Sequence, residues 1–224
     1  MKSITKERTI ILAILGMTLL LNFPFWYSLD FCIRADSHSL KASSAFHFKT
    51  KNLKASKISG IIYINNNWTD AKNAGICNGS GIYSDPYLIK DLIIDGGNTS
   101  NCIKIQNSSV YFRIENCTLF NAGTDLSSQY AGILLNHTRN GMIVNNNCSK
   151  NMYGIFLVSY SSNNTLYGNY VNYNFYSGIS LSTFCSNNTI SRNNANNNSV
   201  FGISISWNSH NNTISKNNAT KNKI

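Results

Sequence analysis

The second half of the chain repeats a short unit every 22 to 24 residues. A Gly-Ile string marks each unit, and these strings begin at Gly132, Gly154, Gly178 and Gly202. The triplet Asn-Asn-Thr keeps the same period, and it begins at Asn163, Asn187 and Asn211. A fixed period of this length indicates a solenoid, in which each repeat packs mainly against its two neighbours.

The composition of the repeat decides which solenoid it predicts. The units hold few Leu residues, which argues against leucine-rich repeats, and their abundant Asn, Ser, Gly and Tyr disfavour helix interiors. Apolar residues alternate with polar ones after each Gly, and a period of two is typical of strands. Short strands that end in polar turn clusters predict an all-β fold, a parallel β-helix with one coil per repeat.

Stacking the coils in register predicts columns of buried apolar side chains. The expected core columns are Ile103, Ile133, Ile155, Ile179 and Ile203; Leu135, Leu157, Leu181 and Ile205; and Ile143, Leu166, Ile190 and Ile214. A further column holds Cys117, Cys148, Val171, Ala195 and Ala219. Since cysteine shares that column with small apolar residues, we expect Cys117 and Cys148 to pack in the core. A disulfide between neighbouring coils and a reactive or metal-binding role are the alternatives.

Asparagine recurs in columns of its own. The expected structural ladders are Asn146, Asn169, Asn193 and Asn217; Asn151, Asn174, Asn198 and Asn222; and Asn163, Asn187 and Asn211. At a coil spacing of about 4.8 Å, identical amides can hydrogen-bond up the stack. Asn also tolerates the left-handed backbone conformation that tight corners need. We therefore expect these residues to form ladders and corners.

The N-terminus predicts export. Residues 1–31 begin with basic residues, continue with an apolar run from Ile10 to Leu21 and end in an aromatic-rich stretch. This order is that of a signal peptide, and the run over residues 10–31 is also long enough for an uncleaved membrane anchor. We expect a hydrophobic helix here, a polar spacer over residues 32–57 and the solenoid over residues 58–224, located outside the cell or on its surface.

Charge and cysteine spacing argue against several classes of protein. The net charge is +10, but about six of those charges lie in residues 1–57, and the other Lys and Arg residues are dispersed. A nucleic-acid-binding protein would show a clustered basic stripe, so nucleic acid is not an expected partner. The six cysteines include no Cys-x-x-Cys pair, which argues against a zinc site, and we expect neither a metal nor a cofactor.

The segments GSGIYSDPYLIKDLIIDG (Gly79 to Gly96) and NCIKIQNSSVYFRIENC (Asn101 to Cys117), together with the following coils, resemble NosD-like β-helix proteins. The resemblance covers residues 58–224 and looks most like exported archaeal proteins, especially those of the Asgard group. It implies a right-handed parallel β-helix of the carbohydrate-binding and sugar-hydrolase superfamily. The sequence stops after Lys221–Ile224, where earlier repeats continue into Gly-Ile, so we expect an incomplete last coil.

Candidate catalytic residues lie only in the early coils. A glycoside hydrolase needs two carboxylates beside the scissile bond, and the sequence has no Asp or Glu after Asp125. If the protein is an enzyme, we expect its chemistry to use Asp91, Asp95, Glu115 and Arg113. The alternative is that the aspartates occupy turns or caps and that Arg113 is a solvated surface residue.

Aromatic residues crowd the late repeats and suggest binding. Tyr153, Tyr176, Phe201 and Trp207 are the candidate ligand-binding residues, because an aromatic row flanked by amides suits sugar rings. The alternative is that these rings stack over the coils for structural reasons. The leading prediction is non-catalytic binding of an extracellular polysaccharide or glycoprotein. The alternatives are a polysaccharide lyase or hydrolase, with its site on the early coils or in a missing C-terminal part, and a structural stalk in a surface layer.

Overall fold

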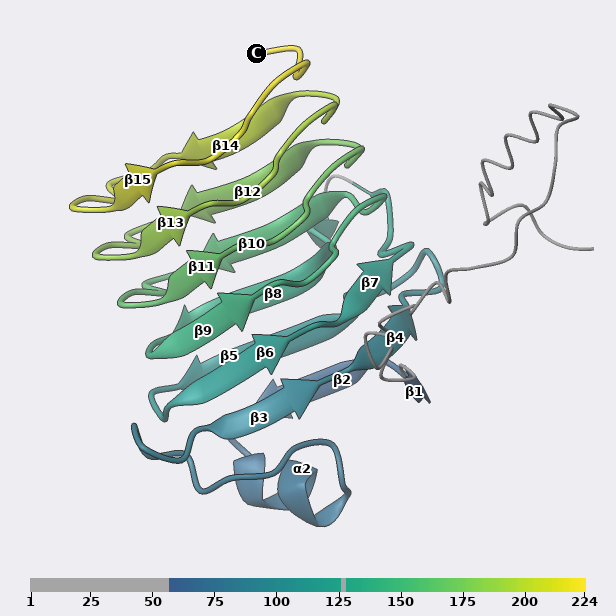
Figure 1. Cartoon of the computed structure of the whole chain (residues 1–224), viewed down its shortest axis with the longest axis vertical. Helices are drawn as coiled ribbons and strands as arrows, with labels where there is room; N and C mark the ends of the chain where they lie inside the picture. The colour runs from purple at the N-terminus through teal and green to yellow at the C-terminus, as the bar shows by residue number, and fades with distance from the viewer. Residues whose placement is uncertain (1–56, 126–127) are drawn as a thin grey trace, which may run out of the picture. The chain divides into compact units, whose positions relative to one another are not determined.

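The computed structural model describes residues 57–125 and 128–224. These residues form successive coils of short strands joined by tight corners (Figure 1). The expected signal or anchor over residues 1–31 and the expected spacer over residues 32–57, apart from Lys57, lie outside the described residues.

The strands form three sheets in which every pair of neighbouring strands is parallel. Sheet A comprises β1 (Lys57–Ser59), β4 (Leu92–Asp95) and β7 (Thr118–Phe120). Sheet B comprises β2 (Ile62–Asn65), β5 (Ile103–Ser108), β8 (Ala131–Thr138), β10 (Tyr153–Val158), β12 (Ser177–Ser182) and β14 (Phe201–Ile205). Sheet C comprises β3 (Tyr87–Lys90), β6 (Phe112–Glu115), β9 (Gly141–Val144), β11 (Thr165–Tyr167), β13 (Thr189–Ser191) and β15 (Thr213–Ser215). One pass through sheets B, C and A makes one coil, which is the parallel β-helix that the repeat predicts.

Sheet A continues above β7 as single backbone bridges rather than as strands. These bridges join Thr118 to Asn147, Asn147 to Tyr170, Tyr170 to Asn194 and Asn194 to Asn218. The third side of the late coils is therefore still stacked in register, although each coil contributes only one paired residue there.

Each corner between sheets C and A turns on one residue with positive φ. This corner column comprises Asp91, Asn116, Asn145, Gly168, Arg192 and Lys216, with φ between 53° and 68°. The left-handed conformation is strained for most residues and is visited most readily by Gly, Asn and Asp. This requirement explains why the first four coils use those residue types at this corner.

The strand register places the apolar columns inside the coils. Ile133 pairs with Ile155, Ile155 with Ile179 and Ile179 with Ile203. On sheet C, the column Ile89, Ile114, Ile143, Leu166, Ile190 and Ile214 is formed in the same way. The members below the last coil are fully buried, so one contiguous apolar core runs along the axis of the coils. The prediction of Ile214 as a core residue was wrong, because this side chain lies on the last coil and is 52% exposed.

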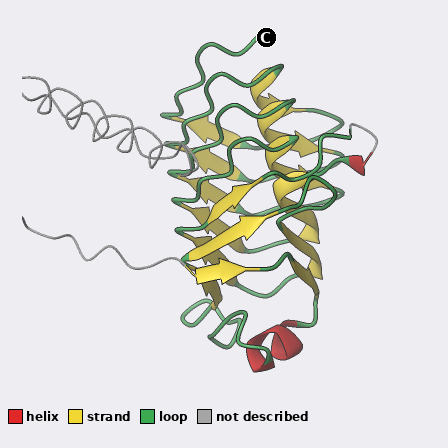
Figure 2. Cartoon of the chain, turned by 90° about the vertical axis from the view of Figure 1, so that its right-hand side faces the viewer, coloured by secondary structure: helices red, strands yellow, loops and turns green. Residues whose placement is uncertain are grey.

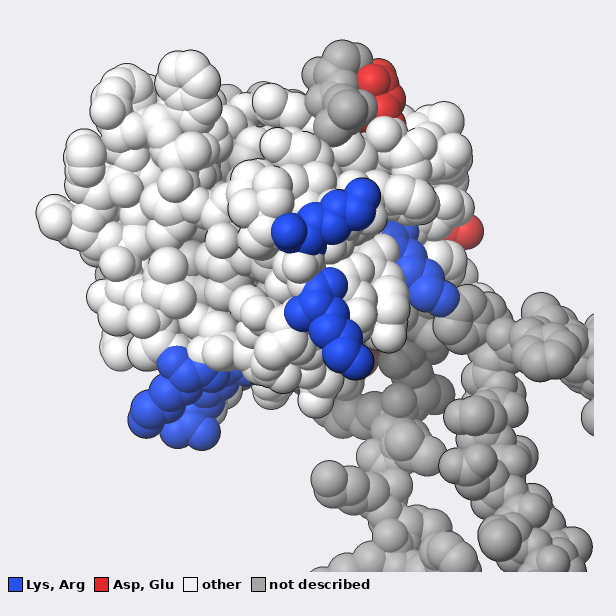
Figure 3. Space-filling view, turned by 90° about the horizontal axis from the view of Figure 1, so that it is seen from above, with Lys and Arg blue, Asp and Glu red and all other residues white. Residues whose placement is uncertain are grey.

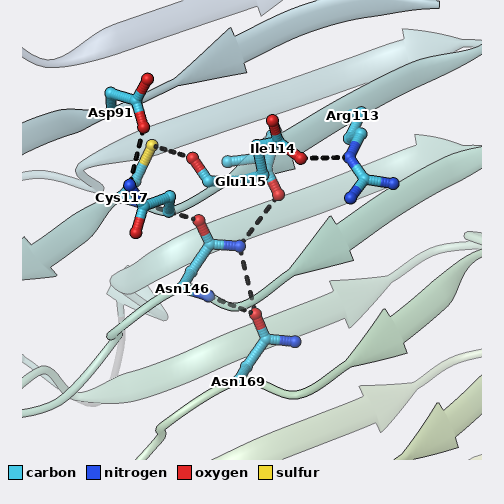
Figure 4. A network of polar contacts seen from close by, with 8 residues as sticks. Asp91, Arg113, Ile114, Glu115, Cys117, Asn146 and Asn169 are labelled. Carbon is cyan, nitrogen blue, oxygen red and sulfur yellow. Dashed lines mark hydrogen bonds and ion pairs between the residues drawn. The ribbon is translucent and has the colours of Figure 1, made fainter. Parts of the chain in front are cut away.

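Asn169 shows how a buried amide is satisfied inside this core (Figure 4). Its Oδ1 accepts from the backbone N–H and from the Nδ2 of Asn146, at 2.9 and 3.1 Å. Its Nδ2 donates to the carbonyl of Ile143 at 2.8 Å and to Oδ1 of Asn193 at 2.9 Å. The amide thus makes four hydrogen bonds, which offsets the desolvation penalty of a buried polar group.

Three columns of amides follow this scheme. The first is Asn146, Asn169, Asn193 and Asn217, and the second is Asn151, Asn174, Asn198 and Asn222. The third is Asn164, Asn188 and Asn212. The prediction of Asn163, Asn187 and Asn211 for this ladder was wrong by one residue. Those three side chains are exposed, and the residues turn the corner before sheet C with φ of 57°, 58° and 55°.

The two core cysteines do not share a column. The bridge between Thr118 and Asn147 sets Leu119, not Cys117, in the column of Cys148. Cys117 lies two residues earlier, where its backbone N–H donates to Oδ1 of Asn146 at 3.0 Å. Both side chains are buried, but Cys117 begins an amide column and Cys148 belongs to an apolar one.

The repeated Gly of the Gly-Ile string is explained by close packing between coils. A Cβ at Gly178 would lie 2.6 Å from the carbonyl oxygen of Gly202 and 2.9 Å from Nδ2 of Asn198. Neither neighbour is free to move, since the first is backbone and the second belongs to an amide ladder. Only a residue without a side chain fits between the strand and the ladder.

A short helix covers the first coil at the end opposite the C-terminal coil (Figure 2). Helix α2 (Trp68–Asn73) buries Trp68, whose ring stacks on Tyr87 with centroids 5.0 Å apart. The indole N–H donates to Oγ of Ser108 at 2.8 Å. The apolar columns at this end are thereby shielded from water.

Removing one amide from the middle of a ladder tests the importance of these columns. Asn169→Ala leaves the N–H groups of Asn146 and the carbonyl of Ile143 without their partner. We expect the free energy of unfolding to fall by about 2–4 kcal/mol in urea titrations.

The matched control is Asn163→Gly in the same coil, since this side chain is exposed and Gly accepts the positive φ. We expect a loss below about 1 kcal/mol from this change. An equal loss in the two variants would contradict the structural role of the ladder.

Candidate functional site

The outer face of sheet B carries a groove across the late coils. Strand alternation sends Ile179 and Leu181 inward and turns Ser180 and Ser182 outward, and β14 repeats this pattern. The groove has a volume of about 600 Å³. We call it the sheet B groove, and its lining includes Tyr153, Phe156, Tyr176, Ser180, Ser182, Phe201, Ser204, Ser206 and Trp207.

An aromatic rim borders the groove where the strands of sheet B begin. Tyr153 and Tyr176 have ring centroids 5.3 Å apart, and Tyr176 and Phe201 have centroids 6.0 Å apart in an edge-to-face arrangement. Tyr153 also stacks on Phe156 with a centroid distance of 4.6 Å. Tyr153 is only 8% exposed, so it supports the rim from below, whereas Tyr176 and Phe201 are partly exposed.

A second aromatic rim stands where the strands of sheet B end. Tyr160 and Phe184 stack with centroids 5.0 Å apart and an interplanar angle of 6°. The backbone N–H of Phe184 donates to the carbonyl of Trp207 at 2.9 Å, so residue 207 lies one coil above Thr183, next to this pair. Trp207 is 77% exposed and lines the groove.

Hydroxyl groups and one apolar ring form the floor between the two rims. Ser204 Oγ donates to Ser180 Oγ at 3.0 Å, so these hydroxyls from neighbouring coils lie side by side. Ser182 and Ser206 lie nearer the second rim, and Phe156 extends the floor toward the earlier coils. The floor therefore offers hydrogen-bonding groups at the spacing of the coils.

The lining of the sheet B groove is uncharged. None of its described residues is Asp, Glu, Lys, Arg or His, and its titratable groups are the two tyrosines. Burial, and secondarily the neighbouring Tyr176, raises the pKa of Tyr153, so the phenol of Tyr153 stays neutral at pH 7. Such a surface suits a neutral ligand with both apolar faces and hydroxyl groups.

The sequence-predicted binding residues Tyr153, Tyr176, Phe201 and Trp207 all line this one groove. Sequence reasoning did not assign Tyr160, Phe184 or the serines to the site. The sequence did contain a pattern that indicates these residues: Tyr160 and Phe184 lie one repeat of 24 residues apart, as do Ser180 and Ser204. The period alone does not tell which corner an exposed ring occupies.

The candidate catalytic carboxylates serve separate corners of the early coils. Asp91 begins the corner column, and its Oδ1 accepts from Nδ2 of Asn116 at 2.6 Å. Asp95 ends β4, and its Oδ1 accepts from the Gly97 N–H at 2.8 Å and from Asn121 Nδ2 at 2.7 Å. Strand β4 lies between the aspartates, which sets their Cα atoms about 13 Å apart.

Arg113 and Glu115 are paired with each other on the outer face of sheet C. Nε of Arg113 donates to Oε2 of Glu115 at 2.5 Å (Figure 4). Glu115 thus lies near Asp91, whose backbone N–H donates to the Glu115 carbonyl at 3.2 Å. The carboxylate of Glu115, however, is engaged in the ion pair with Arg113.

The five described cysteines are free thiols in buried positions. Burial raises the pKa of Cys102 to about 12 and that of Cys117 and Cys185 to about 11. The pKa of Cys148, which is fully buried, also lies well above its ordinary value because of burial. These thiols stay protonated at neutral pH, which makes them packing residues rather than nucleophiles. Cys32 lies outside the described residues.

The described part of the chain contains neither a membrane-spanning helix nor a metal-binding cluster. No helix there is long and apolar enough to cross a membrane. Across residues 57–125 and 128–224, no group of three or more His, Cys, Asp or Glu side chains is placed to hold a metal ion.

Comparison with known proteins assigns the family. A family model described as a right handed beta helix region matches residues 59–224. The chain belongs to this family. No curated protein and no solved structure matches the chain. The match establishes the right-handed β-helix fold and leaves the activity open, since one fold hosts many functions.

The buried thiols make stability depend on pH. A folded-state pKa above the unfolded value of 9.0 gives stability that is complete below pH 9 and is lost as the pH rises toward 11 and 12. We expect the free energy of unfolding to fall by about 1 kcal/mol per such thiol between pH 8 and pH 10. Urea titrations at both pH values measure this loss.

Cys148→Val is the matched variant, since Val171 occupies the same column one coil later. It removes one thiol, and we expect it to reduce the loss by about 1 kcal/mol. Stability that does not change between pH 8 and pH 10 in the parent protein would contradict the burial of the thiols.

Proposed function

We propose that the protein binds a neutral polysaccharide in the sheet B groove and does not cleave it. The observation that carries the proposal is the placement of aromatic rings on either side of a serine floor, Tyr176 with Phe201 on one side and Trp207 on the other. Sugar rings present apolar C–H faces edged by hydroxyl groups. The rims can stack on the faces, while the serines exchange hydrogen bonds with the hydroxyls.

The dimensions of the groove suit a chain of several sugar rings. Strand β12 has six residues, so the floor between the two rims is about 20 Å wide. Similar groups recur in neighbouring coils at about 4.8 Å along the axis, since Ser180 is followed by Ser204 and Tyr176 by Phe201. A repeating surface of this kind suits a repeating polymer better than a single small molecule.

The absence of charge from the groove lining supports a binding rather than a catalytic role. Acid–base cleavage of a glycosidic bond uses two carboxylates whose separation is about 5–9.5 Å. Within the described residues, the groove lining contains no carboxylate. Asp91, Asp95 and Glu115 lie on the early coils, where each makes the contacts of a corner or an ion pair.

The location outside the cell is part of the same proposal. It is supported by the order of residues 1–31, in which a basic segment precedes the apolar run from Ile10 to Leu21. The NosD-like and archaeal character rests on the resemblance of Gly79 to Gly96 and of the coils that follow. In this proposal the polysaccharide, or the glycan of a glycoprotein, is met at the cell surface.

Affinity electrophoresis of the full chain tests the binding. Native gels are cast with neutral polysaccharides, namely a β-glucan, a mannan, a xylan and a galactan. We expect migration to be retarded in at least one of these gels without a cleared zone. We also expect Trp207→Ala and Phe201→Ala to weaken the retardation about tenfold, because each removes one aromatic ring that lines the groove.

The matched control is Tyr83→Ala, since Tyr83 is 81% exposed and lies outside the sheet B groove. This variant should bind like the parent protein. Unchanged migration in every gel would contradict the proposal and favour a structural stalk. A cleared zone would instead show cleavage and direct attention to Asp91, Asp95, Glu115 and Arg113.

A further inference from the structure

A second groove lies at the corner between sheets C and A in the late coils. It has a volume of about 530 Å³ and shares no lining residue with the sheet B groove. We call it the corner groove, and the residues that matter in it are Tyr167, Tyr170, Arg192, Asn194 and Lys216. In contrast to the sheet B groove, it holds two cations.

The choice of residues at this corner is not explained by the backbone. Arg192 and Lys216 occupy successive positions of the corner column, and each has a φ of 56°. Earlier coils place Asp, Asn or Gly there, which are the residues that visit this conformation most readily. Long cationic side chains do not relieve the strain of a left-handed corner. The backbone conformation therefore gives no reason for cations in two successive coils of this corner.

Two tyrosines flank the cations of the corner groove. Tyr167 and Tyr170 line the groove together with Arg192 and Lys216. Gly168 precedes Arg192 in the corner column, and Oδ1 of Asn145 occupies the space that a Cβ would take there, at 2.3 Å. The Arg192 guanidinium lies 5.9 Å from the centre of the Tyr167 ring, which orients it beside the groove.

The two cations have no acidic counterpart in the described structure. No carboxylate within residues 57–125 and 128–224 forms an ion pair with Arg192 or Lys216. The sequence has no Asp or Glu after Asp125. Figure 3 shows the basic side chains in separate groups, and the group at its lower left has no acidic side chain next to it. Two like charges one coil apart repel each other, and a bound anion would relieve that repulsion.

The groove also contains an acceptor that lacks a donor. Oδ1 of Asn194 is buried and has no hydrogen-bond partner among the described residues. Buried acceptors without partners are rare and call for an explanation. A ligand hydroxyl would satisfy this oxygen, whereas a simple inorganic anion without a hydrogen to donate would not.

We infer that the corner groove binds the acidic group of a charged saccharide, a uronate carboxylate or a sulfate ester. Arg192 and Lys216 hold the anionic oxygens, the tyrosines flank the sugar ring, and Asn194 accepts from a hydroxyl. Nucleic acid is the less suitable partner, since its affinity comes from many phosphate contacts along a basic stripe, and this groove offers two cations. The site does not depend on the proposed function of the sheet B groove.

Calorimetric titration of the full chain tests this inference with four probes: oligogalacturonate, a sulfated oligosaccharide, a neutral oligosaccharide of equal length and inorganic phosphate. We expect one of the two acidic saccharides to bind and the neutral one to leave this site empty. The double variant Arg192→Gln with Lys216→Gln should weaken acidic binding at least tenfold. Glutamine keeps a long unbranched side chain at both corners, so the backbone strain at positive φ is unchanged.

The matched control is Lys221→Gln with Lys223→Gln, which removes the same charge from exposed positions outside the groove. It should change the affinity less than twofold. Trp207→Ala should leave acidic binding intact, which separates this site from the sheet B groove. Equal losses in the two double variants, equal affinity for inorganic phosphate, or no binding of either acidic saccharide would overturn the inference.

Discussion

The buried amide ladder is the interaction on which the rest of this structure depends. An Asn side chain inside an apolar core is unfavourable unless all of its hydrogen-bonding groups are used. Asn169 uses all of them, because it accepts twice from the coil before it and donates both to that coil and to the next. Such an amide can be satisfied only when neighbouring coils are in register. The ladder therefore aligns the coils as well as holding them together.

The alignment of the interior is transmitted to the surface. When Ile179 and Leu181 are held in their columns, the alternating serines between them must face outward in register. The same holds at the corners, where each coil sets one residue at positive φ in every column. The repeat thus arranges the aromatic rings of the sheet B groove, and the two cations of the corner groove, in rows along the coils. Both proposed binding sites are formed by outer columns, while the inner columns stay almost constant.

Much of the fold could be predicted from the sequence because both the apolar residues and the asparagines recur with the period of the coils. The apolar columns follow directly, since strand alternation leaves only one way for Ile155 and Leu157 to face inward. The errors arose where adjacent residues are alike or where spacing changes. In the Asn163-Asn164 pair the sequence does not reveal which amide turns the corner and which enters the ladder. Cys117 was misplaced because the segment before β8 departs from the period.

The sequence indicated which aromatic residues are candidates for binding, but it did not indicate that they share one surface. Tyr176, Phe201 and Trp207 stand out by composition, yet their shared groove depends on which strand end each ring occupies. The second rim was missed because Tyr160 and Phe184 lie at a corner whose direction is set by the fold. The corner groove was harder still, since Arg192 and Lys216 come together with Tyr167 and Tyr170 only when the coils are stacked in register.

The most direct test of the account is a crystal structure of the protein with a bound neutral oligosaccharide taken from whichever polysaccharide retards it. We predict sugar rings over Ser180 and Ser204, with one ring against Tyr176 or Phe201 and another against Trp207. A ligand bound elsewhere on the coils, with the serine floor still open to water, would contradict the claim that these aligned outer columns form the binding site.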